Sequence, residues 1–406
     1  MRFERVVYNA IESKGHLNFI AKLIILYYFS TPFLYLFRTL SGDAGFGYFV
    51  LRISEPILLF STLFVLVLQS KPKLNAYSLS FLFIGIYGFL VALLQKNHLI
   101  DIVAGYFHFM TGILLFIYFY NASQTVALDK FMRIFSIATM MSCSFVIGFM
   151  YCMPYILGFH IYLGLACQAL IMVFFYNFQK HRPVLWISSL LLIIFSGKRG
   201  VLVALVIGFI ISCVFLLHKV NVKTILKSLM GGLILAAFFI VVLPSTSEQL
   251  ISKYTYEDRG SVDEYSAGRL NEVISAYNTW AFDIEKVIIG SGFGFTYTYT
   301  HSQADQPDVE EYKNVHFSYI NPVIIFGVPV SLIYFVALGL LLIRMLSSVA
   351  VEYSYLKWSC ITYLIYASFV FNLFDEPIFW MINGILLGQS QRLNQRSQQE
   401  FPCESY

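Results

Sequence analysis

The chain has 406 residues, of which 58% are hydrophobic and only 12% are charged. Soluble domains carry about twice this charged fraction, and an aromatic fraction of 18% is more than one soluble core can bury. The composition therefore indicates a polytopic membrane protein and argues against a cytosolic enzyme. The net charge of +4 fits basic cytoplasmic loops, so it implies no nucleic acid or other acidic macromolecular partner.

Apolar runs along the chain predict twelve membrane-spanning helices, because a helix needs about 20 residues to cross a hydrocarbon core of about 30 Å. The run at 183–196 falls short of this length, and its helix would measure only about 21 Å. The predicted spans lie near 17–37, 47–69, 76–95, 99–120, 131–153, 155–178, 183–196, 201–217, 224–243, 316–343, 355–374 and 377–390.

One sizeable polar region, 244–315, interrupts these runs, and its 12 carboxylates against 5 basic residues fit a solvated domain. We expect an all-α polytopic membrane protein with this one large periplasmic loop. The predicted parts are transmembrane helices 1–9 over 1–243, the loop over 244–315, transmembrane helices 10–12 over 316–390, and a cytoplasmic tail over 391–406.

The basic residues predict the orientation, because short cytoplasmic loops are enriched in Lys and Arg. With a cytoplasmic N-terminus, 17 of the 27 basic residues fall in loops on the cytoplasmic side. The short outer loops and span ends then hold only Arg38, Arg52, Lys96, Lys198 and Arg199. The sequence therefore predicts that both termini are cytoplasmic and that the polar loop is external.

The external loop contains a predicted amphipathic helix at about 267–281, where apolar residues recur at helical spacing. The glycine-rich stretch Gly290-Ser-Gly-Phe-Gly-Phe and the alternating Thr296-Tyr-Thr-Tyr-Thr follow it. We interpret this stretch as a mobile loop that displays aromatic side chains. Its tyrosines fit either the aromatic belt at a membrane interface or a surface on which sugars stack.

We expect no metal site and no cofactor. The six cysteines have no CxxC spacing, and no His-Glu-x-x-His or comparable pattern occurs. The Gly290-x-Gly-x-Gly stretch lacks the helical continuation and the acidic residue about 20 positions later that a dinucleotide fingerprint needs. Gly197-Lys198 has neither the first glycine nor the Ser/Thr of a phosphate-binding P-loop.

Two cations stand where topology or helix physics disfavours them. Arg199, in Ser196-Gly-Lys-Arg-Gly, is predicted in a recessed outer loop, and its flanking glycines allow close backbone approach, which favours an anion site. Neighbouring Lys198 could instead extend to lipid phosphates. Arg269 lies in the first turn of the external helix, where the dipole disfavours a cation, so it binds an anion or pairs with Glu272 or Glu264.

His316 begins the tenth predicted span on its outer edge, where a histidine is either an interfacial residue or a titratable group facing the site. His98, His108, His160 and His301 are weaker candidates. Arg52 shares a helical face with Glu55 near the outer side of the second span, and pairing between them is the ordinary explanation. Together these residues predict an external anion site with two phosphate-binding arginines and one titratable histidine.

Three stretches resemble the bacterial O-antigen polymerase and O-antigen ligase superfamily. They are Ser196-Gly-Lys-Arg-Gly, then Ala267-Gly-Arg-Leu followed by Trp280 and Gly290-x-Gly-x-Gly, and finally Val315-His at the head of a span. The twelve-span layout with one late external loop also resembles that of the superfamily. The resemblance implies a membrane glycosyltransferase whose donor is a glycan on undecaprenyl pyrophosphate, working without a metal or a nucleotide sugar.

The resemblance also implies residue roles. Arg199 and Arg269 would bind the pyrophosphate and stabilise the leaving group, and His316 would serve as the general base for the acceptor hydroxyl or orient it. We further expect Lys198, Arg52, Tyr319, Gly292 and Gly294 to contact substrate. The implied location is the bacterial inner membrane, and the implied partners are lipid-linked donor and acceptor and a chain-length regulator.

Within the superfamily, the sequence favours a polymerase, which joins a growing chain to a new lipid-linked repeat unit. Phe317 follows the histidine where an Asn often stands in the ligase-like pattern. The architecture is also lean, because the chain has only one sizeable polar region besides its predicted spans. The alternative is a ligase that transfers the glycan to the lipid A core. A glycolipid flippase or other transporter is the alternative of another class, although no repeated halves are detectable. An envelope scaffold would leave the Gly-Lys-Arg-Gly loop unexplained.

Overall fold

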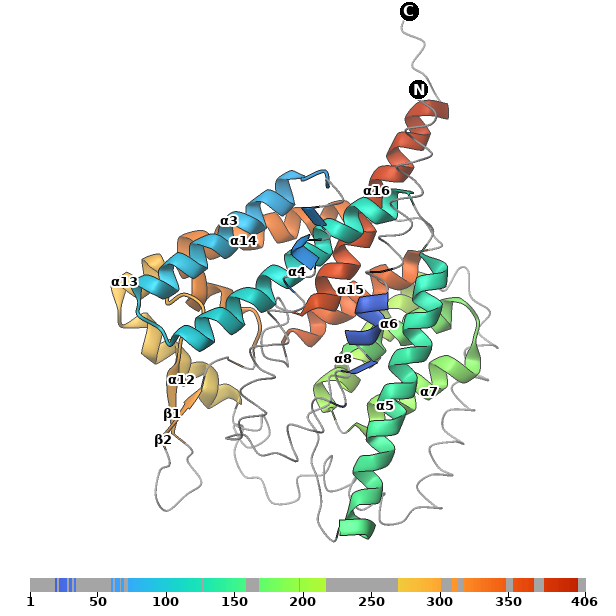
Figure 1. Ribbon diagram of the computed structural model, residues 1–406, viewed down its shortest axis with the longest axis horizontal. Helices are drawn as coiled ribbons and strands as arrows, with labels where there is room; N and C mark the ends of the chain where they lie inside the picture. The colour runs from blue at the N-terminus through green and yellow to red at the C-terminus, as the bar shows by residue number, and fades with distance from the viewer. Residues whose placement is uncertain are drawn as a thin grey trace, which may run out of the picture.

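The computed structural model describes residues 19, 22–27, 29–30, 33, 60, 63–65, 67–68, 72–125, 128–157, 168–196, 198–216, 269–300, 309–312, 315, 317–347, 353–368 and 376–400. Within these ranges the chain is almost entirely helical (Figure 1). The predicted spans at 17–37 and 47–69 are described only in short pieces, and the span at 224–243 lies outside the described residues.

The described elements follow the apolar runs closely. In chain order they are α3 (Ala76–Leu94), α4 (Leu99–Thr125), α5 (Asp129–Leu157), α6 (Gln168–Gln179), α7 (Pro183–Phe195), α8 (Arg199–Leu216), α12 (Arg269–Ala281), α13 (Ile284–Ile289), β1 (Tyr297–Thr300), β2 (Val309–Tyr312), α14 (Ile320–Ser347), α15 (Ser354–Tyr366) and α16 (Pro377–Glu400).

Among the described helices, α3, α4, α5 and α14 are long and apolar enough to cross a membrane, while α7 and α8 are apolar but shorter. This finding supports a helical membrane protein. The number of twelve spans stays a prediction, as do the domain boundaries.

Local sequence explains where two of these helices begin. The Asn75 side chain accepts a hydrogen bond from the Ser78 backbone N–H at 2.8 Å, and the Ser78 hydroxyl accepts one from the Asn75 backbone N–H at 2.9 Å. This capping box pairs two of the amide groups that the first turn of α3 leaves open. Helix α7 begins at Pro183, whose fixed φ suits the first helical position.

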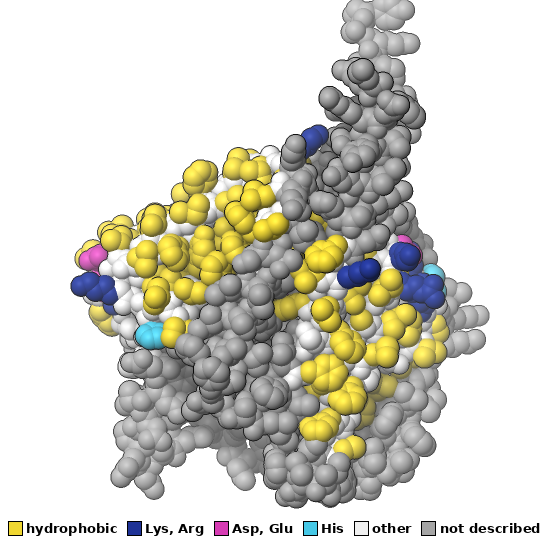
Figure 2. All heavy atoms as spheres, in the orientation of Figure 1, with side chains coloured by type: hydrophobic (Ala, Val, Ile, Leu, Met, Phe, Trp, Pro, Cys, Tyr) yellow, Lys and Arg dark blue, Asp and Glu magenta, His cyan; other side chains and the backbone are white. Residues whose placement is uncertain are grey.

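Helices α3, α4, α14 and α16 pack around Trp380, which is fully buried on α16. Its ring lies edge-on to Phe81 at 4.8 Å and to Phe116 at 6.1 Å between centroids. Glycines bring α4 and α16 together, since a Cβ on Gly384 would lie only 2.5 Å from the Phe116 carbonyl oxygen. The outward faces of α3 and α14 are covered with hydrophobic side chains (Figure 2).

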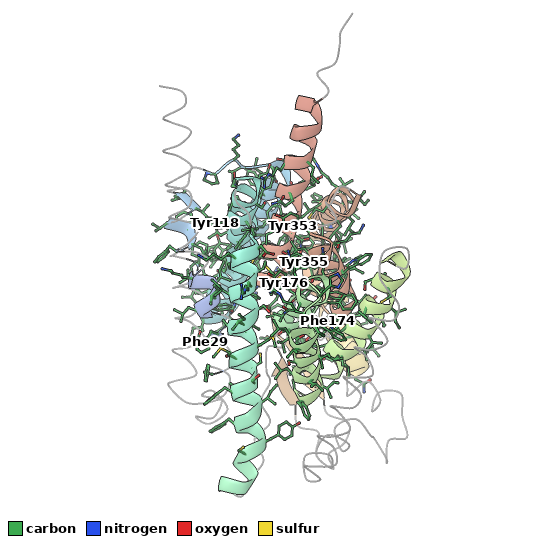
Figure 3. All side chains as sticks on the ribbon, turned by 90° about the vertical axis from the view of Figure 1, so that its right-hand side faces the viewer. Phe29, Tyr118, Phe174, Tyr176, Tyr353 and Tyr355 are labelled. Carbon is green, nitrogen blue, oxygen red and sulfur yellow. The ribbon has the colours of Figure 1, made fainter. Side chains whose placement is uncertain are left out.

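A second group of helices, α5 to α8 with α15, packs through aromatic rings. Phe174 on α6 lies 5.6 Å from Trp186 on α7 and 5.6 Å from Phe209 on α8, edge-on in both cases. Tyr176 on α6 meets Tyr355 on α15 at 5.2 Å (Figure 3). Such edge-on pairs add specific geometry to apolar packing, so α6 is held on three sides.

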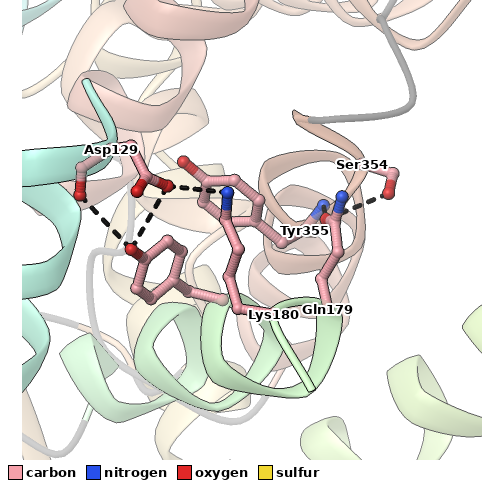
Figure 4. Close-up of polar contacts among 6 residues, drawn as sticks. Asp129, Gln179, Lys180, Ser354 and Tyr355 are labelled. Atoms are coloured by element: carbon pink, nitrogen blue, oxygen red, sulfur yellow. Dashed lines mark hydrogen bonds and ion pairs between the residues drawn. The ribbon is translucent and has the colours of Figure 1, made fainter. Parts of the chain in front are cut away.

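Polar contacts tie the helices together at one end of this group (Figure 4). The Lys180 ammonium lies 2.7 Å from the Asp129 carboxylate, which joins the end of α6 to the start of α5. The Gln179 side-chain oxygen accepts hydrogen bonds from the Ser354 hydroxyl at 3.0 Å and from the Tyr355 backbone N–H at 2.6 Å. The C-terminal end of α6 therefore lies beside the N-terminal end of α15, and the two helices run antiparallel.

The structure corrects two expectations for the external loop. Strands β1 and β2 form an antiparallel two-stranded sheet, with Tyr297 opposite Tyr312 and Thr300 opposite Val309, so the fold is not purely α. The stretch from Gly290 to Phe295 is not an aromatic display, because Phe293 and Phe295 are buried. The amphipathic helix expected at 267–281 is confirmed as α12.

Candidate functional site

The start of α8, which carries Arg199, and the start of α14, which follows His316, lie at the same end of α15. Helices α6, α7 and α8 are joined by short connections and alternate in direction, so the N-terminus of α8 lies at the end where α15 finishes. At this end the Tyr363 hydroxyl donates to the Gln168 carbonyl at the start of α6. The Ser318 backbone N–H, just before α14, donates to the Ala367 carbonyl at 2.9 Å.

The loop between α7 and α8 is short and held by its serine. Ser196 is fully buried, its hydroxyl donates to the Ile193 carbonyl at 2.7 Å, and the Lys198 backbone N–H donates to the Ser196 hydroxyl at 3.3 Å. Arg199 is the first residue of α8, and Lys198 is half-buried beside it. The loop thus places the backbone of Lys198 and Arg199 between the end of α7 and the start of α8, two apolar helices.

This loop ends before its neighbouring helix does, as the sequence predicts for a recessed site. Helix α7 has 13 residues, which is about 20 Å of helix. The Tyr151 hydroxyl on α5 donates to the Phe195 carbonyl at 2.9 Å, and α5 continues for six residues beyond Tyr151, or about 9 Å. Helix α5 therefore extends past the backbone of the loop that carries Lys198 and Arg199.

The backbone on each side of His316 is fixed, although His316 itself lies outside the described residues. Val315 is buried, its N–H donates to the Asn321 side-chain oxygen at 3.1 Å, and the Asn321 amide donates to the Val315 carbonyl at 3.0 Å. The pairing closes a loop over the first turn of α14. Asn321 was not predicted, yet an amide in the first turn of an apolar span is a sequence signal for such a loop closure.

Tyr319 has a structural partner in place of the substrate contact expected for it. Its hydroxyl donates to the Leu364 carbonyl on α15 at 2.5 Å, and its ring lies 5.6 Å from that of Phe317. The bond holds the start of α14 against the end of α15, and a substrate-binding role for Tyr319 stays a prediction.

Helix α12 carries Arg269 at its start, and a buried bond attaches the helix to the hairpin. The Glu272 carboxylate accepts a hydrogen bond from the Tyr297 hydroxyl on β1 at 2.6 Å, and both residues are buried. Sequence reasoning offered Glu272 as a surface partner of Arg269 and Tyr297 as an interfacial or sugar-stacking ring. The structure buries both groups against each other, which positions the helix one turn beyond Arg269, and pairing of Glu272 with Arg269 stays a prediction.

The glycine-rich stretch fits the space between α3, α4 and α14. Gly290, Gly292 and Gly294 all have positive φ, and the Ser291 and Gly292 backbone N–H groups donate to the carbonyls of α14 at 2.8 and 2.9 Å. The Asn97 amide donates to the carbonyls of Ser291 and Phe293 at 2.7 and 2.8 Å. The glycines thus have a packing role, and contact of Gly292 and Gly294 with substrate stays a prediction.

The structure thus places the starts of α8 and α14 at the same end of α15, while the approach of α12 to them stays a prediction. The side chains of Arg199 and Arg269 are not among those it describes, and Arg52 lies outside the described residues together with His316. Within the described part of the chain, no cluster of three or more metal-ligating side chains occurs. The convergence of two guanidinium groups and an imidazole on one anion stays a prediction from the sequence.

Residues 183–335 match the family model for O-antigen ligase. This finding supports the O-antigen polymerase and ligase superfamily that the sequence motifs resemble. The matched segment runs from the start of α7 into α14, so it contains both the loop at Arg199 and the whole segment that is predicted to be external. No curated protein matches the sequence. The chain thus has helices long and apolar enough to cross a membrane, and its residues 183–335 are similar to the O-antigen ligase family.

Proposed function

We propose, from the O-antigen ligase family domain at residues 183–335, that this protein is a surface-polysaccharide polymerase. It transfers a growing O-antigen or similar glycan from undecaprenyl pyrophosphate to a lipid-linked repeat unit on the periplasmic face. One observation carries this proposal. Arg199 and Arg269 were singled out as cations in unfavourable places and His316 as a titratable group at the head of a span, and all three fall inside the matched segment, whereas Arg52 does not.

The reaction follows from the chemistry of these three side chains. An acceptor hydroxyl oxygen attacks the anomeric carbon of the donor glycan, and the bond from that carbon to the pyrophosphate oxygen breaks. The bonding electrons leave with undecaprenyl pyrophosphate, and the hydroxyl proton goes to His316. Arg199 and Arg269 donate hydrogen bonds to the phosphate oxygens where negative charge grows. The imidazole suits this task because its ordinary pKa is about 6.5.

The described neighbours of these residues support the proposal. The short α7 leaves its loop about 9 Å below the end of α5, which suits a lipid phosphate that must stay near the membrane surface. The Asn321 pairing with Val315 and the Ser318 bond to Ala367 fix the backbone that flanks His316. Rigid support of this kind is what a general base needs in order to meet a hydroxyl within hydrogen-bonding distance.

The proposed orientation of the chain in a bacterial inner membrane places the external segment in the periplasm and both termini in the cytoplasm. The described basic residues at the end opposite the site support it. They lie where α3, α7 and α15 begin and where α6 and α14 end, and they include Lys73, Lys180, Arg182, Arg344 and Lys357. An excess of Lys and Arg in short loops is typical of the cytoplasmic side.

Reporter fusions test this orientation. A reporter that is active only in the periplasm should be active when fused after residue 198 or 280, and inactive after residue 180, 222 or 395. The reason is that helices α7 and α16 each separate a basic end from the site end of the molecule. Activity after residue 180, or inactivity after residue 280, would contradict the orientation and with it the periplasmic site.

A ligase is the second candidate, because the matched family model is described as O-antigen ligase and the family covers both activities. The two differ in the acceptor: a polymerase uses a lipid-linked repeat unit, and a ligase uses the lipid A core. A flippase would act earlier, by delivering repeat units to the outer face. Since the three proteins act at successive steps, loss of each leaves a different product.

A deletion strain separates these functions on one gel. Without a polymerase, the long ladder of surface polysaccharide should disappear while core molecules that bear a single repeat unit remain. Absence of the one-unit band, with long lipid-linked chains accumulating in the inner membrane, would instead identify a ligase. Single units retained on the cytoplasmic face would identify a flippase. Where the glycan is a capsule or exopolysaccharide, the length of lipid-linked oligosaccharide on the outer face gives the same discrimination.

A further inference from the structure

The turn from α12 to α13 leaves large apolar side chains exposed within an otherwise polar external segment. Phe282 is 86% exposed, Ile284 77%, Ile288 55% and Tyr277 51%. Exposure of this kind at contiguous positions marks an interaction surface, whereas a single exposed apolar residue needs no explanation. We call the surface formed by Tyr277, Phe282, Ile284 and Ile288 the turn patch.

The turn patch continues the outward apolar faces of two membrane-spanning helices. The Tyr87 hydroxyl on α3 donates to the Ile289 carbonyl at 2.8 Å, and a Cβ on Gly327 of α14 would lie 2.8 Å from the Ile288 carbonyl carbon. Helix α13 is therefore seated against both α3 and α14. Both helices also expose apolar side chains, namely Leu90 and Leu94 on α3 and Val328 and Leu332 on α14. Figure 2 shows hydrophobic side chains gathered over α3 and α14.

The contact between α13 and α3 indicates how deep α13 lies in the bilayer. Helix α3 has 19 residues, about 28 Å, which matches the hydrocarbon core of a bilayer. Tyr87 lies seven residues before Leu94 at the end of α3, or about 10 Å inward along the axis. In the bilayer that α3 crosses, α13 therefore lies at the boundary between acyl chains and headgroups, where interfacial helices insert by about 5–10 Å.

Charged side chains border the turn patch where headgroups would lie. Lys286 pairs with Asp283 at 3.4 Å, and the Gln95 amide donates to the Glu285 carboxylate at 3.3 Å. Lys96 follows Gln95 in the turn after α3. Basic side chains with apolar stems suit this level of a membrane, because the stem packs on acyl chains while the ammonium meets lipid phosphate.

We propose that the turn patch is an interfacial membrane anchor whose occupant is the phospholipid of the external leaflet. Phe282, Ile284 and Ile288 insert among the acyl chains, and Lys286 meets the phosphates. The anchor holds α12, which begins at Arg269, flat against the membrane surface. This inference requires α3 and α14 to span the bilayer, and it does not depend on which glycan or acceptor the protein uses.

Spin-label depth measurements test the anchor in the full chain reconstituted into vesicles of phosphatidylethanolamine and phosphatidylglycerol. Native cysteines other than the buried Cys143 and Cys360 are replaced by serine, and a nitroxide is attached to Ile284→Cys or Ile288→Cys. Thr279→Cys, an exposed polar position on α12, is the matched control. Leu90→Cys on the outward face of α3 gives the value for a label in lipid.

The label at positions 284 and 288 should collide more often with oxygen than with a water-soluble nickel complex. Its oxygen-to-nickel ratio should lie several-fold above that at 279 and near that at 90, because oxygen concentrates in the acyl region. Water-like ratios at 284, 288 and 279 alike would overturn the anchor. Spin–spin broadening at 284 that disappears on dilution with unlabelled chain would overturn it as well, since a second copy would then cover the patch.

Discussion

Replacing Gly292 by alanine should destabilise the protein by about 2–5 kcal/mol, from left-handed backbone strain of about 1–2 kcal/mol together with overpacking of about 1–3 kcal/mol. Gly292 has a φ of +73°, and an added Cβ would lie 2.7 Å from the Ala92 Cβ and closer still to the Ala92 backbone nitrogen and Cα. These are backbone atoms inside a spanning helix, so they have little room to move.

The measurement is thermal unfolding of purified variants in the same detergent. Gly339→Ala is the matched control, because nothing lies within 4 Å of the added Cβ on this α14 residue. In a helix interior the control should be neutral or stabilising by up to about 1 kcal/mol. Equal midpoints for Gly292→Ala and Gly339→Ala would show that the glycine stretch does not pack against α3.

This example shows what sequence reasoning could find and what it could not. The apolar runs located the helices well, with α3 expected at 76–95 and found at Ala76–Leu94, because a spanning helix must be apolar along its whole length. The glycine stretch was assigned to substrate and to mobility. Its actual neighbours, α3 and α4, are about 190 residues away in sequence, and no local pattern reports such a contact.

The hairpin was missed for a related reason. Tyr297-Thr-Tyr-Thr alternates as a strand does, but its partner Val309-Glu-Glu-Tyr is acidic and follows a polar stretch that reads as a loop. The burial of Tyr297 depends on Glu272, which stands on another element 25 residues earlier. A carboxylate on the inner face of α12 is the one sequence sign that the helix packs against a hydrogen-bond donor.

The candidate site residues were predicted from a different signal, namely a residue type that is unfavourable at its position in the chain. Arg199 and Arg269 were found because an outer loop and a helix N-terminus are poor places for cations. Asn321 escaped notice because it lies within an apolar span, although it fixes the backbone before His316 through Val315. Charged residues in unfavourable places thus indicated the predicted reacting groups, while the supporting amide of Asn321 was found only from its hydrogen bonds in the structure.

Replacing Arg199 or Arg269 by lysine should lower the turnover of lipid-linked donor by about 100-fold or more, the usual loss when one preoriented donor to a developing oxyanion is removed. Lysine keeps the charge, but its ammonium cannot donate two parallel hydrogen bonds to phosphate oxygens as a guanidinium does. Since both residues would act where charge grows on the leaving pyrophosphate, kcat should fall more than KM rises.

The control for these variants is Arg344→Lys, an exposed arginine in the last turn of α14 at the end opposite the site, which should keep normal turnover. All three proteins should unfold at the same temperature as the unaltered chain, so a loss of rate cannot come from a loss of fold. Turnover of a purified lipid-pyrophosphate glycan is the readout. Near-normal rates for both Arg199→Lys and Arg269→Lys would remove the arginines from the leaving-group role, and the anion site would then have to be assigned to other cations on the external face.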